Sequence, residues 1–342
     1  ASAFFAEAVL SAIDTYVIIR MYIPISERKN FHMQEYVMGN GAIALGALAA
    51  GVNLVAGYPG TPSSEILETI SKYRHDGVYI EWSVNEKAAM EVAAAAAYSG
   101  ARAMVTMKQV GLNVAADPLM SLAYVGVKGG MVIVSADDPG PISSQTEQDT
   151  RRFADFCRIP VFDPSSPEEA YKMIGEAFEY SEKYNTPVLF RPTTRVCHAY
   201  ASIDNCDSPS PKKYEGFVKD SKKWVIFPRL SFANHIMIEK RNVEIGKDFS
   251  TYSANKAEGV NSEKAVVTSG ISYAYTKECL KDYPDVKLIK IATAYPFPED
   301  FVLSSLEGAK EVLCIEELSP FIEEQILKLA GKHGLQLRES GK

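Results

Sequence analysis

The sequence predicts an α/β protein in which a parallel-sheet domain is followed by a smaller α/β domain. Between residues 39 and 191, short apolar runs typical of buried strands alternate with helical segments. This alternation favours a parallel sheet that helices cover on both faces. It fails over residues 201–262 and resumes near Lys264, and at 342 residues the chain is long enough for two domains.

The first elements follow from capping residues and apolar runs. An alanine-rich helix over residues 39–50 is expected to end at Gly51, because glycine is favoured just past the end of a helix. Residues 54–58 then form a short strand. We predict that the next helix has Thr61 as its N-cap and Pro62 as its first residue.

Two more capped helices are predicted in the first domain. Asn85 is the N-cap of one of them, and Ser166 opens the other in a capping box with Glu169. Gly111 is expected in a turn that precedes a further helix. A long polar loop over residues 136–150 favours a functional role. The remaining predicted strands are residues 78–82, 103–107, 131–135 and 188–191.

The second domain repeats the alternation on a smaller scale. We place the first domain at residues 33–200, a connecting segment rich in Lys, Ser, Asp and Asn at 201–262, and the second domain at 263–342. The predicted strands of the second domain are 265–268, 287–291 and 311–315, and its helices are 272–281, 298–305 and 320–333.

Residues 1–32 form an extension that we assign to neither domain. Glu7, Asp14 and Arg20 interrupt its apolar stretch, whereas a membrane-spanning helix needs about 20 nearly uncharged residues. It also lacks a basic start and a small-residue cleavage site, which a secretory signal would show. We expect an amphipathic helix that docks on the body, or foreign sequence upstream of a natural start near Met33.

Charge and cysteine usage exclude several classes of protein. A net charge of −7 argues against binding to duplex nucleic acid, which requires a basic surface. The cysteines show no CxxC spacing, so we expect free thiols in a reducing, cytoplasmic compartment and neither a zinc site nor an iron–sulfur cluster in this segment. Histidine spacing predicts no metal site either. The five cysteines are Cys157, Cys197, Cys206, Cys279 and Cys314.

Three polar loops are the candidates for a functional site. The chain contains no Ser-His-Asp pattern, HExxH, Walker motif or GxGxxG. The loops are residues 57–64, 83–87 and 108–113, and each follows a predicted strand. Because carboxyl ends of parallel strands share one edge of the sheet, we expect the three loops to converge where such sheets bind ligands.

Glu86 is the acidic residue that this arrangement singles out. It stands in the first turn of a predicted helix, where the helix dipole by itself favours an acid. The helix behind it is unusually rich in alanine, which allows close approach of a ligand or of another backbone. A buried subunit contact explains such a helix equally well.

Several long segments together resemble the alpha subunits of indolepyruvate:ferredoxin oxidoreductases, which belong to the thiamine-diphosphate (TPP) 2-oxoacid:ferredoxin oxidoreductases. In order along the chain, the segments are GYPGTPSSEI at 57–66, the run from EWSVNEKAAM to KQVGLNVAADPLM at 81–120, SADDPGPISSQTEQD at 135–149, PVLFRPTTRVCH at 187–198, VVTSGISYAY at 266–275, IATAYPFPED at 291–300 and CIEELSPFIEEQI at 314–326. The resemblance implies a pyrimidine-binding domain followed by a domain like the C-terminal domain of transketolase.

The resemblance also implies a role for Glu86. In this family TPP lies between a pyrimidine domain and a separate diphosphate domain. A glutamate of the pyrimidine domain hydrogen-bonds N1′ of the aminopyrimidine and so favours the tautomer that removes the C2 proton of the thiazolium. By its position in the motif, that glutamate is Glu86. A carboxyl group in an apolar pocket suits this task because it can share a proton with a ring nitrogen.

Five further residues are implied to line the cofactor or substrate region: Gly60, Thr61, Lys108, Gln109 and Asn113. The family pattern reads KHVGLN where this chain has KQVGLN, so Gln109 replaces a histidine. That change puts a proton-shuttling role at this position in doubt. The loop over residues 143–149 is assigned to a dimer face or to the substrate entrance.

Full-length members of the family carry further parts that this segment lacks. The resemblance implies that the diphosphate domain with its magnesium ion, the 4Fe–4S clusters and a beta subunit complete the enzyme. Ferredoxin, CoA and a 2-oxoacid are the implied reaction partners, with an acyl-CoA as the product. We expect this segment to form a homodimer, to bind neither nucleic acid nor membrane, and to be inactive alone.

Two other functions stay open at this point. The chain could belong to a non-oxidative TPP-dependent 2-oxoacid decarboxylase, whose pyrimidine domains also use a glutamate. It could also be a non-catalytic scaffold subunit. Aldehyde release in place of ferredoxin or viologen reduction would favour the first alternative, and an active enzyme without the Glu86 carboxylate would favour the second.

Overall fold

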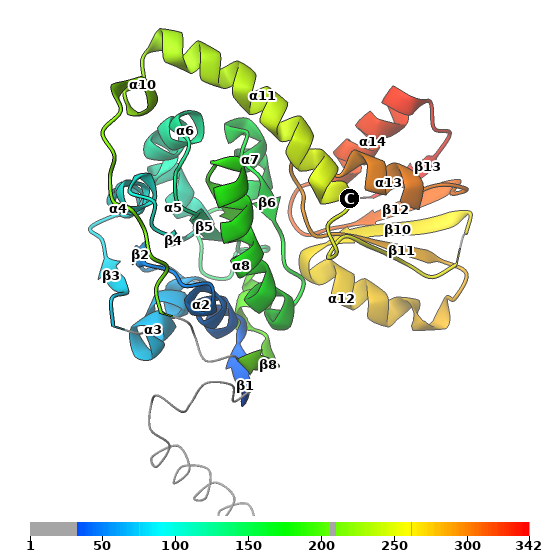
Figure 1. The fold of residues 1–342 in the computed structure, drawn as a ribbon. Coiled ribbons are helices and arrows are strands. Elements are labelled where there is room, and N and C mark those ends of the chain that lie inside the picture. Colours follow the sequence, from blue (N-terminus) through cyan, green and yellow to red (C-terminus); the bar gives the residue numbers. More distant parts are fainter. Residues whose placement is uncertain (1–32, 75, 206–209, 261, 342) are drawn as a thin grey trace, which may run out of the picture.

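The computed structural model describes residues 33–74, 76–205, 210–260 and 262–341, arranged as two α/β units side by side (Figure 1). The expected extension over residues 1–32 lies outside the described residues. A two-stranded antiparallel sheet of β1 (Met33–Met38) and β8 (Tyr200–Asn205) lies at the border of the first unit. No helix in the described part of the chain is both long and apolar enough to cross a membrane.

The first unit is built on a six-stranded sheet, and all of its strands are parallel, as predicted. The strand order is β3-β2-β4-β5-β7-β6. The five predicted strands are present, whereas the two-residue β6 was too short to recognise in the sequence. The bounds are β2 (Leu54–Gly57), β3 (Tyr79–Trp82), β4 (Ala103–Lys108), β5 (Met131–Ala136), β6 (Val161–Phe162) and β7 (Val188–Phe190).

Helices cover both faces of this sheet, which is why its central strands are buried and mostly apolar, whereas the edge strand β3 is partly exposed. On β4, Ala103, Val105 and Met107 pack toward one helical layer, and Met104 packs toward the other. The first layer comprises α4 (Glu86–Tyr98), α5 (Gln109–Val114), α6 (Ala116–Val125) and α7 (Thr150–Cys157). The second comprises α2 (Gly39–Ala49), α3 (Ser64–Tyr73) and α8 (Pro167–Tyr184). The short helix α9 (Thr194–His198) follows β7.

The predicted helix starts are confirmed at two positions. Asn85 accepts a hydrogen bond from the amide of Ala88 at 2.9 Å, and Ser166 accepts one from the amide of Glu169 at 3.2 Å. The Glu169 carboxylate bonds to the amide and hydroxyl of Ser165, so only half of the capping box forms.

Two local predictions were wrong. Helix α3 begins at Ser64 rather than at Pro62, so Thr61 is not its N-cap. The carbonyl of Gly60 accepts bonds from the amide and hydroxyl of Ser63, and this turn separates Thr61 from the helix. Gly111 lies inside α5 rather than in a turn, because it packs against a side chain from α4.

The second unit has a five-stranded mixed sheet of order β13-β12-β10-β11-β9, in which only β9 runs antiparallel to its neighbour. Its three predicted strands and three predicted helices are present. The bounds are β9 (Lys256–Glu258), β10 (Lys264–Ser269), β11 (Lys287–Ile291), β12 (Glu311–Ile315), β13 (Arg338–Ser340), α12 (Gly270–Cys279), α13 (Glu299–Ser305) and α14 (Phe321–His333), with a 3₁₀ turn at Leu280–Asp282.

The connecting segment contains a long helix that the sequence analysis did not predict. After the short α10 (Ser221–Trp224), α11 (Pro228–Ser250) runs from α6 of the first unit to the second unit (Figure 1). Ile238, Ile245 and Phe249 are its buried apolar residues, and their helical spacing was hidden by the polar residues around them. The domain boundaries themselves stay a prediction.

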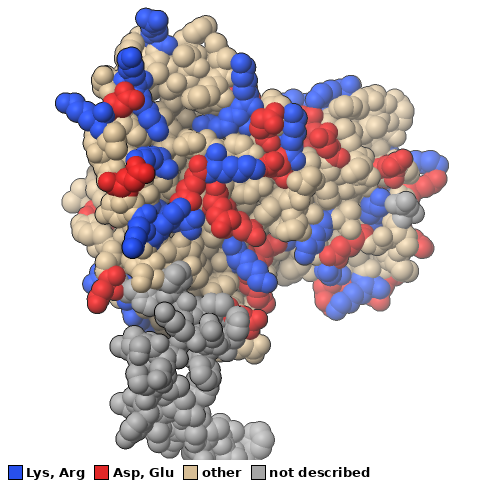
Figure 2. Space-filling model, viewed as in Figure 1, with Lys and Arg blue, Asp and Glu red and all other residues tan. Residues whose placement is uncertain are grey.

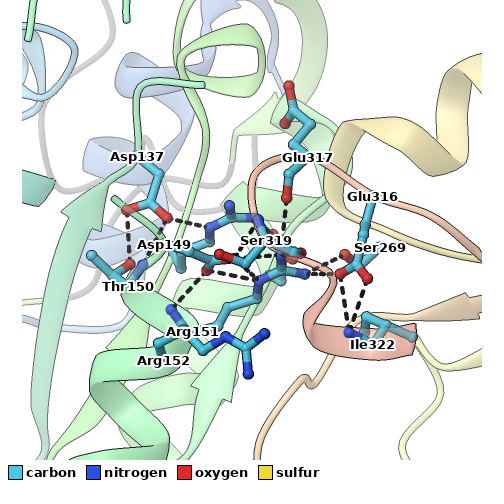
Figure 3. A network of polar contacts seen from close by, with 12 residues as sticks. Asp137, Asp149, Thr150, Arg151, Arg152, Ser269, Glu316, Glu317, Ser319 and Ile322 are labelled. Atoms are coloured by element: carbon cyan, nitrogen blue, oxygen red, sulfur yellow. Dashed lines mark hydrogen bonds and ion pairs between the residues drawn. The ribbon is translucent and has the colours of Figure 1, made fainter. Parts of the chain in front are cut away.

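A buried ion network joins the two units (Figure 3). Arg151 of α7 is fully buried and binds both oxygens of Asp149, which precedes the same helix. From the second unit it contacts the Glu316 carboxylate at 2.8 Å, the Ser269 hydroxyl at 3.2 Å and the Ser319 carbonyl at 3.1 Å. One guanidinium therefore crosslinks α7 to the loop that precedes α14.

A second buried guanidinium lies in the first unit. Arg191 binds Asp137 at 2.7 Å and Asp163 at 3.2 Å, and Asp137 in turn accepts bonds from the amide and hydroxyl of Thr150. Because Asp137 and Thr150 bound the polar loop over residues 137–150, this network pins both ends of that loop.

Four buried carboxyl groups share these two guanidinium groups, so they do not ionise equally. Burial raises the pKa of Asp137 to about 6, although Arg191 opposes the shift. Burial also raises the pKa values of Asp163 and Glu316. Burial acts in the same direction on Asp149, but Arg151 outweighs it and holds the pKa of that carboxyl at about 2. Asp149 is therefore firmly ionised. The other three acids, Asp137, Asp163 and Glu316, hold a proton more readily than ordinary carboxyl groups do.

We expect Arg151→Met to lower the free energy of unfolding by about 3–5 kcal/mol, because it leaves Asp149 and Glu316 buried without their cation. Arg152→Met is the matched control. Its guanidinium also lies over the ring of Phe321, but its ion pair with Glu324 is solvent-exposed. We expect Arg152→Met to lower the free energy of unfolding by less than about 1 kcal/mol. Urea unfolding measures both, and equal losses would contradict a structural role for the buried network.

The raised pKa of Asp137 predicts a pH dependence of stability. Between its ordinary value of 3.8 and about 6, the folded chain keeps a proton that the unfolded chain has lost. The free energy of unfolding should therefore fall as pH rises through this window, by up to about 1.4 kcal/mol per pH unit.

Asp137→Asn removes this titration, so its unfolding free energy should decline less between pH 4 and pH 6 than that of the unaltered chain. Asp204→Asn, at an exposed position of β8, controls for the loss of a carboxylate. Parallel curves for Asp137→Asn and the unaltered chain in urea unfolding would show that the titrating group lies elsewhere.

Candidate functional site

The three predicted loops do converge at the carboxyl edge of the parallel sheet. Strands β3, β2 and β4 are adjacent and end at Trp82, Gly57 and Lys108. The polar loop that follows β5 joins them there, since the Ser143 hydroxyl donates to the carbonyl of Thr61 at 3.1 Å. Four loops thus surround one region of the sheet edge.

Glu86 is the buried acid of this region. As the first residue of α4 it is only 9% exposed, although the neighbouring Val84 is 84% exposed. Its side chain lies against Gly111 of α5, where an added β-carbon would stand 2.5 Å from Oε1 and 2.8 Å from Cγ. Within the described chain, no residue hydrogen-bonds to the Glu86 carboxylate. Its oxygens are therefore available to a polar group from outside.

Gly111 is a site residue that the sequence analysis missed. Any larger side chain at this position would displace the Glu86 carboxylate, so the small residue shapes the site. The available signal was a glycine within a helical segment, which costs stability relative to alanine unless packing requires it.

Lys108 and Gly60 form a second contact between loops. An added β-carbon at Gly60 would lie 3.1 Å from the Lys108 Cγ and Cδ atoms, so the lysine stem packs directly over this glycine. The Lys108 ammonium group reaches Gln145 Oε1 at 3.5 Å. The two predicted residues are thus brought together, and the loop after β5 lies beside them.

The same loop also contacts Gln109 and Asn113. Gln109 is fully buried and donates from Nε2 to the carbonyl of Thr146 at 3.3 Å, while its Oε1 is buried without a hydrogen-bond donor. Asn113 donates to Gln148 at 3.1 Å. Gln109 therefore lies beneath the loop, whereas Asn113 lies at its edge.

Asp138 gives this loop its shape. One of its oxygens accepts the amides of Ile142, Ser143 and Ser144 at 2.9–3.1 Å, and the other accepts the Thr194 hydroxyl at 2.8 Å. Burial opposes ionisation of this carboxyl, but the amide and hydroxyl donors outweigh burial and lower its pKa. Together with Asp137, it holds the loop over the predicted site residues.

This arrangement suits an organic ligand better than a metal ion. In the described ranges, no group of three or more His, Cys, Asp or Glu side chains is placed to hold a metal. The region instead offers the Glu86 carboxylate, a buried amide oxygen of Gln109 without a donor, and the ammonium group of Lys108.

Comparison with known proteins identifies a family and several relatives. Residues 45–259 match the family described as pyruvate flavodoxin/ferredoxin oxidoreductase, thiamine diphosphate-binding. The chain is 43% identical over 315 residues to the indolepyruvate oxidoreductase subunit IorA of Thermococcus kodakarensis, covering 90% of this chain and 49% of that protein. It is 41% identical to the IorA subunit of Methanothermobacter thermautotrophicus, with 90% and 50% covered. The chain therefore spans about half the length of these relatives.

Solved structures share the fold at low sequence identity. The 2-oxoglutarate:ferredoxin oxidoreductase of Magnetococcus marinus superposes with a TM-score of 0.71 at 18% identity, covering 90% of this chain and 62% of that one. A split-gene transketolase superposes with a TM-score of 0.57 at 13% identity, covering 89% and 87%. With a family match over more than half of its residues, the chain belongs to the thiamine-diphosphate-binding pyruvate flavodoxin/ferredoxin oxidoreductase family.

Proposed function

We propose that this chain is the pyrimidine-binding part of an indolepyruvate oxidoreductase alpha subunit, and that Glu86 shares a proton with N1′ of the TPP aminopyrimidine. The observation that carries the proposal is Glu86, a residue only 9% exposed whose carboxylate accepts no hydrogen bond from the described chain. A largely buried side chain whose carboxylate oxygens remain open at the carboxyl edge of the sheet supports a ligand that donates a hydrogen bond to them.

The residues around Glu86 support the same ligand. Gly111 leaves the space that the Glu86 side chain occupies, and Oε1 of Gln109, which is buried without a donor, is a proposed acceptor for a polar ring substituent. Gly60, Thr61, Lys108 and Asn113 are proposed to line the cofactor or substrate region. When bound, TPP supplies the carbanion chemistry of 2-oxoacid decarboxylation. This chain contributes the orientation of the ring and the proton partner at N1′.

The remaining parts of the reaction are proposed to come from outside this segment. The relatives are about twice as long, and IorA is named as one subunit of an oxidoreductase. We infer that a diphosphate-binding domain with magnesium, 4Fe–4S clusters and a beta subunit complete the enzyme. Aryl 2-oxoacids of the indolepyruvate class and CoA are the proposed substrates, ferredoxin is the proposed electron acceptor, and the compartment is the cytoplasm.

We expect Glu86→Gln to lower the rate of arylpyruvate-dependent viologen reduction by about 10²–10⁴-fold in the reconstituted enzyme, because an amide cannot share a proton as a carboxyl group does. Glu91→Gln is the matched control, since Glu91 is an exposed residue of the same helix. The control should retain full activity.

Three outcomes of this assay would contradict the proposal. Full activity of Glu86→Gln would favour a scaffold role for the chain. Aldehyde release without reduction of viologen would favour a non-oxidative decarboxylase. Equal losses in the Glu86 and Glu91 variants would place the effect in the folding of α4 rather than in a proton transfer.

Gly111→Ala should also lower this activity, because its β-carbon would meet the Glu86 carboxylate. We expect the Glu86→Gln, Gly111→Ala double variant to be no slower than Glu86→Gln alone, since both changes act through the same group. Gly331→Ala in α14 has open space around it and serves as the control. The control should stabilise the fold by up to about 1 kcal/mol without an effect on rate. Additive rate losses in the double variant would show that Gly111 acts independently of Glu86.

A further inference from the structure

A cavity of about 690 Å³ lies at the opposite edge of the parallel sheet from Glu86. It is open to solvent and is lined by the end of α6, the end of α8, α10 and α11. Gly126 and Val127, which precede β5, and Asn185, which precedes β7, place it at the amino ends of these strands. The cavity is therefore separate from the proposed TPP region.

The lining of this cavity is strongly basic, although the chain as a whole carries a net charge of −7. It contains five basic side chains and only one acidic side chain, Glu244, which pairs with Lys247. Of the basic side chains, Lys183 pairs with Asp248. The other four have no acidic partner among the described residues; they are Lys222, Lys223, Lys240 and Arg241. Figure 2 shows basic side chains gathered over α10 and the first part of α11.

Arg241 is the least compensated of these cations. Its Nε and Nη2 atoms are buried and have no hydrogen-bond acceptor. Burial lowers the pKa of this guanidinium to about 10, and only the nearby Tyr295 acts in the opposite direction. Arg241 as a whole is half-buried and has no acidic partner among the described residues, whereas Arg151 and Arg191 are surrounded by carboxylates. Arg241 lines the cavity, so an anion held there would compensate it.

We propose that this cavity binds a phosphate-bearing ligand of the nucleotide class. Phosphate groups match a guanidinium and several ammonium groups, because they offer multiple acceptor oxygens and more than one negative charge. Tyr124, Leu230 and Met237 give the cavity an apolar wall against which a base can pack. The volume lies in the range of about 300–1,000 Å³ that is typical of small-molecule sites.

The test is calorimetric titration of the full chain with ADP, pyrophosphate and adenosine at low ionic strength. ADP should bind more tightly than pyrophosphate because it adds the base, and adenosine should bind at least about tenfold more weakly than ADP because it lacks the phosphates. Added salt should weaken ADP binding. Absence of ADP binding, or equal binding of adenosine, would overturn the proposal. Binding of poly-glutamate but not of ADP would also overturn it, in favour of an acidic protein segment.

A triple variant locates the site. Lys222→Gln, Lys223→Gln and Lys240→Gln together should weaken ADP binding at least about tenfold, since three charge-assisted contacts are lost. Lys72→Gln, Lys264→Gln and Lys328→Gln remove three exposed lysines outside the cavity lining and form the matched control. The control should bind ADP as the unaltered chain does. Equal loss of ADP affinity in both triple variants would show that binding depends on the net charge of the chain and not on this cavity.

Arg241→Met separates binding from folding. It should weaken ADP binding while the melting temperature without ligand stays the same or rises, because the variant removes a half-buried cation whose Nε and Nη2 atoms have no acceptor. ADP should raise the melting temperature of the unaltered chain but not that of this variant. Unchanged ADP affinity in Arg241→Met would exclude the cavity as the binding site.

Discussion

The guanidinium groups of Arg151 and Arg191 are buried beside four carboxyl groups, and Arg151 links the first domain to the second. Charges removed from water must be paired, and each pair has narrow geometric limits. Arg151 satisfies these limits only when the loop before α14 lies against α7. Arg191 and Asp137 meanwhile hold the first residue of α7. The loop over residues 137–150 therefore has little freedom.

That loop matters because it covers the carboxyl edge of the sheet. Its backbone and side chains contact Thr61, Lys108, Gln109 and Asn113, which come from two of the converging loops. A change at the domain junction would consequently reach the candidate site through the loop. The Glu86 carboxylate is positioned differently, by its place at the start of α4 and by the absence of a side chain at Gly111.

The two edges of the sheet differ in their electrostatics. At the carboxyl edge a buried acid without a partner faces a region proposed to bind the TPP pyrimidine ring. At the amino edge the half-buried Arg241, whose Nε and Nη2 atoms have no acceptor, lines a basic cavity. Neither side chain has a partner of opposite charge among the described residues, unlike Arg151 and Arg191. Ligands of opposite chemical character are therefore expected at the two edges.

The sequence by itself determined the α/β class, the longer central strands of both domains and the loops that carry the candidate site. Apolar runs and capping residues such as Asn85 and Ser166 act locally, so they are readable from the chain alone. It also supplied the resemblance that singled out Glu86. Only the tertiary structure decided that Gly111 meets Glu86, that Thr61 lies outside α3, that α11 joins the two domains, and that Arg241 lacks a counter-ion. These features depend on contacts between residues far apart in the chain, and local propensity carries no information about such contacts.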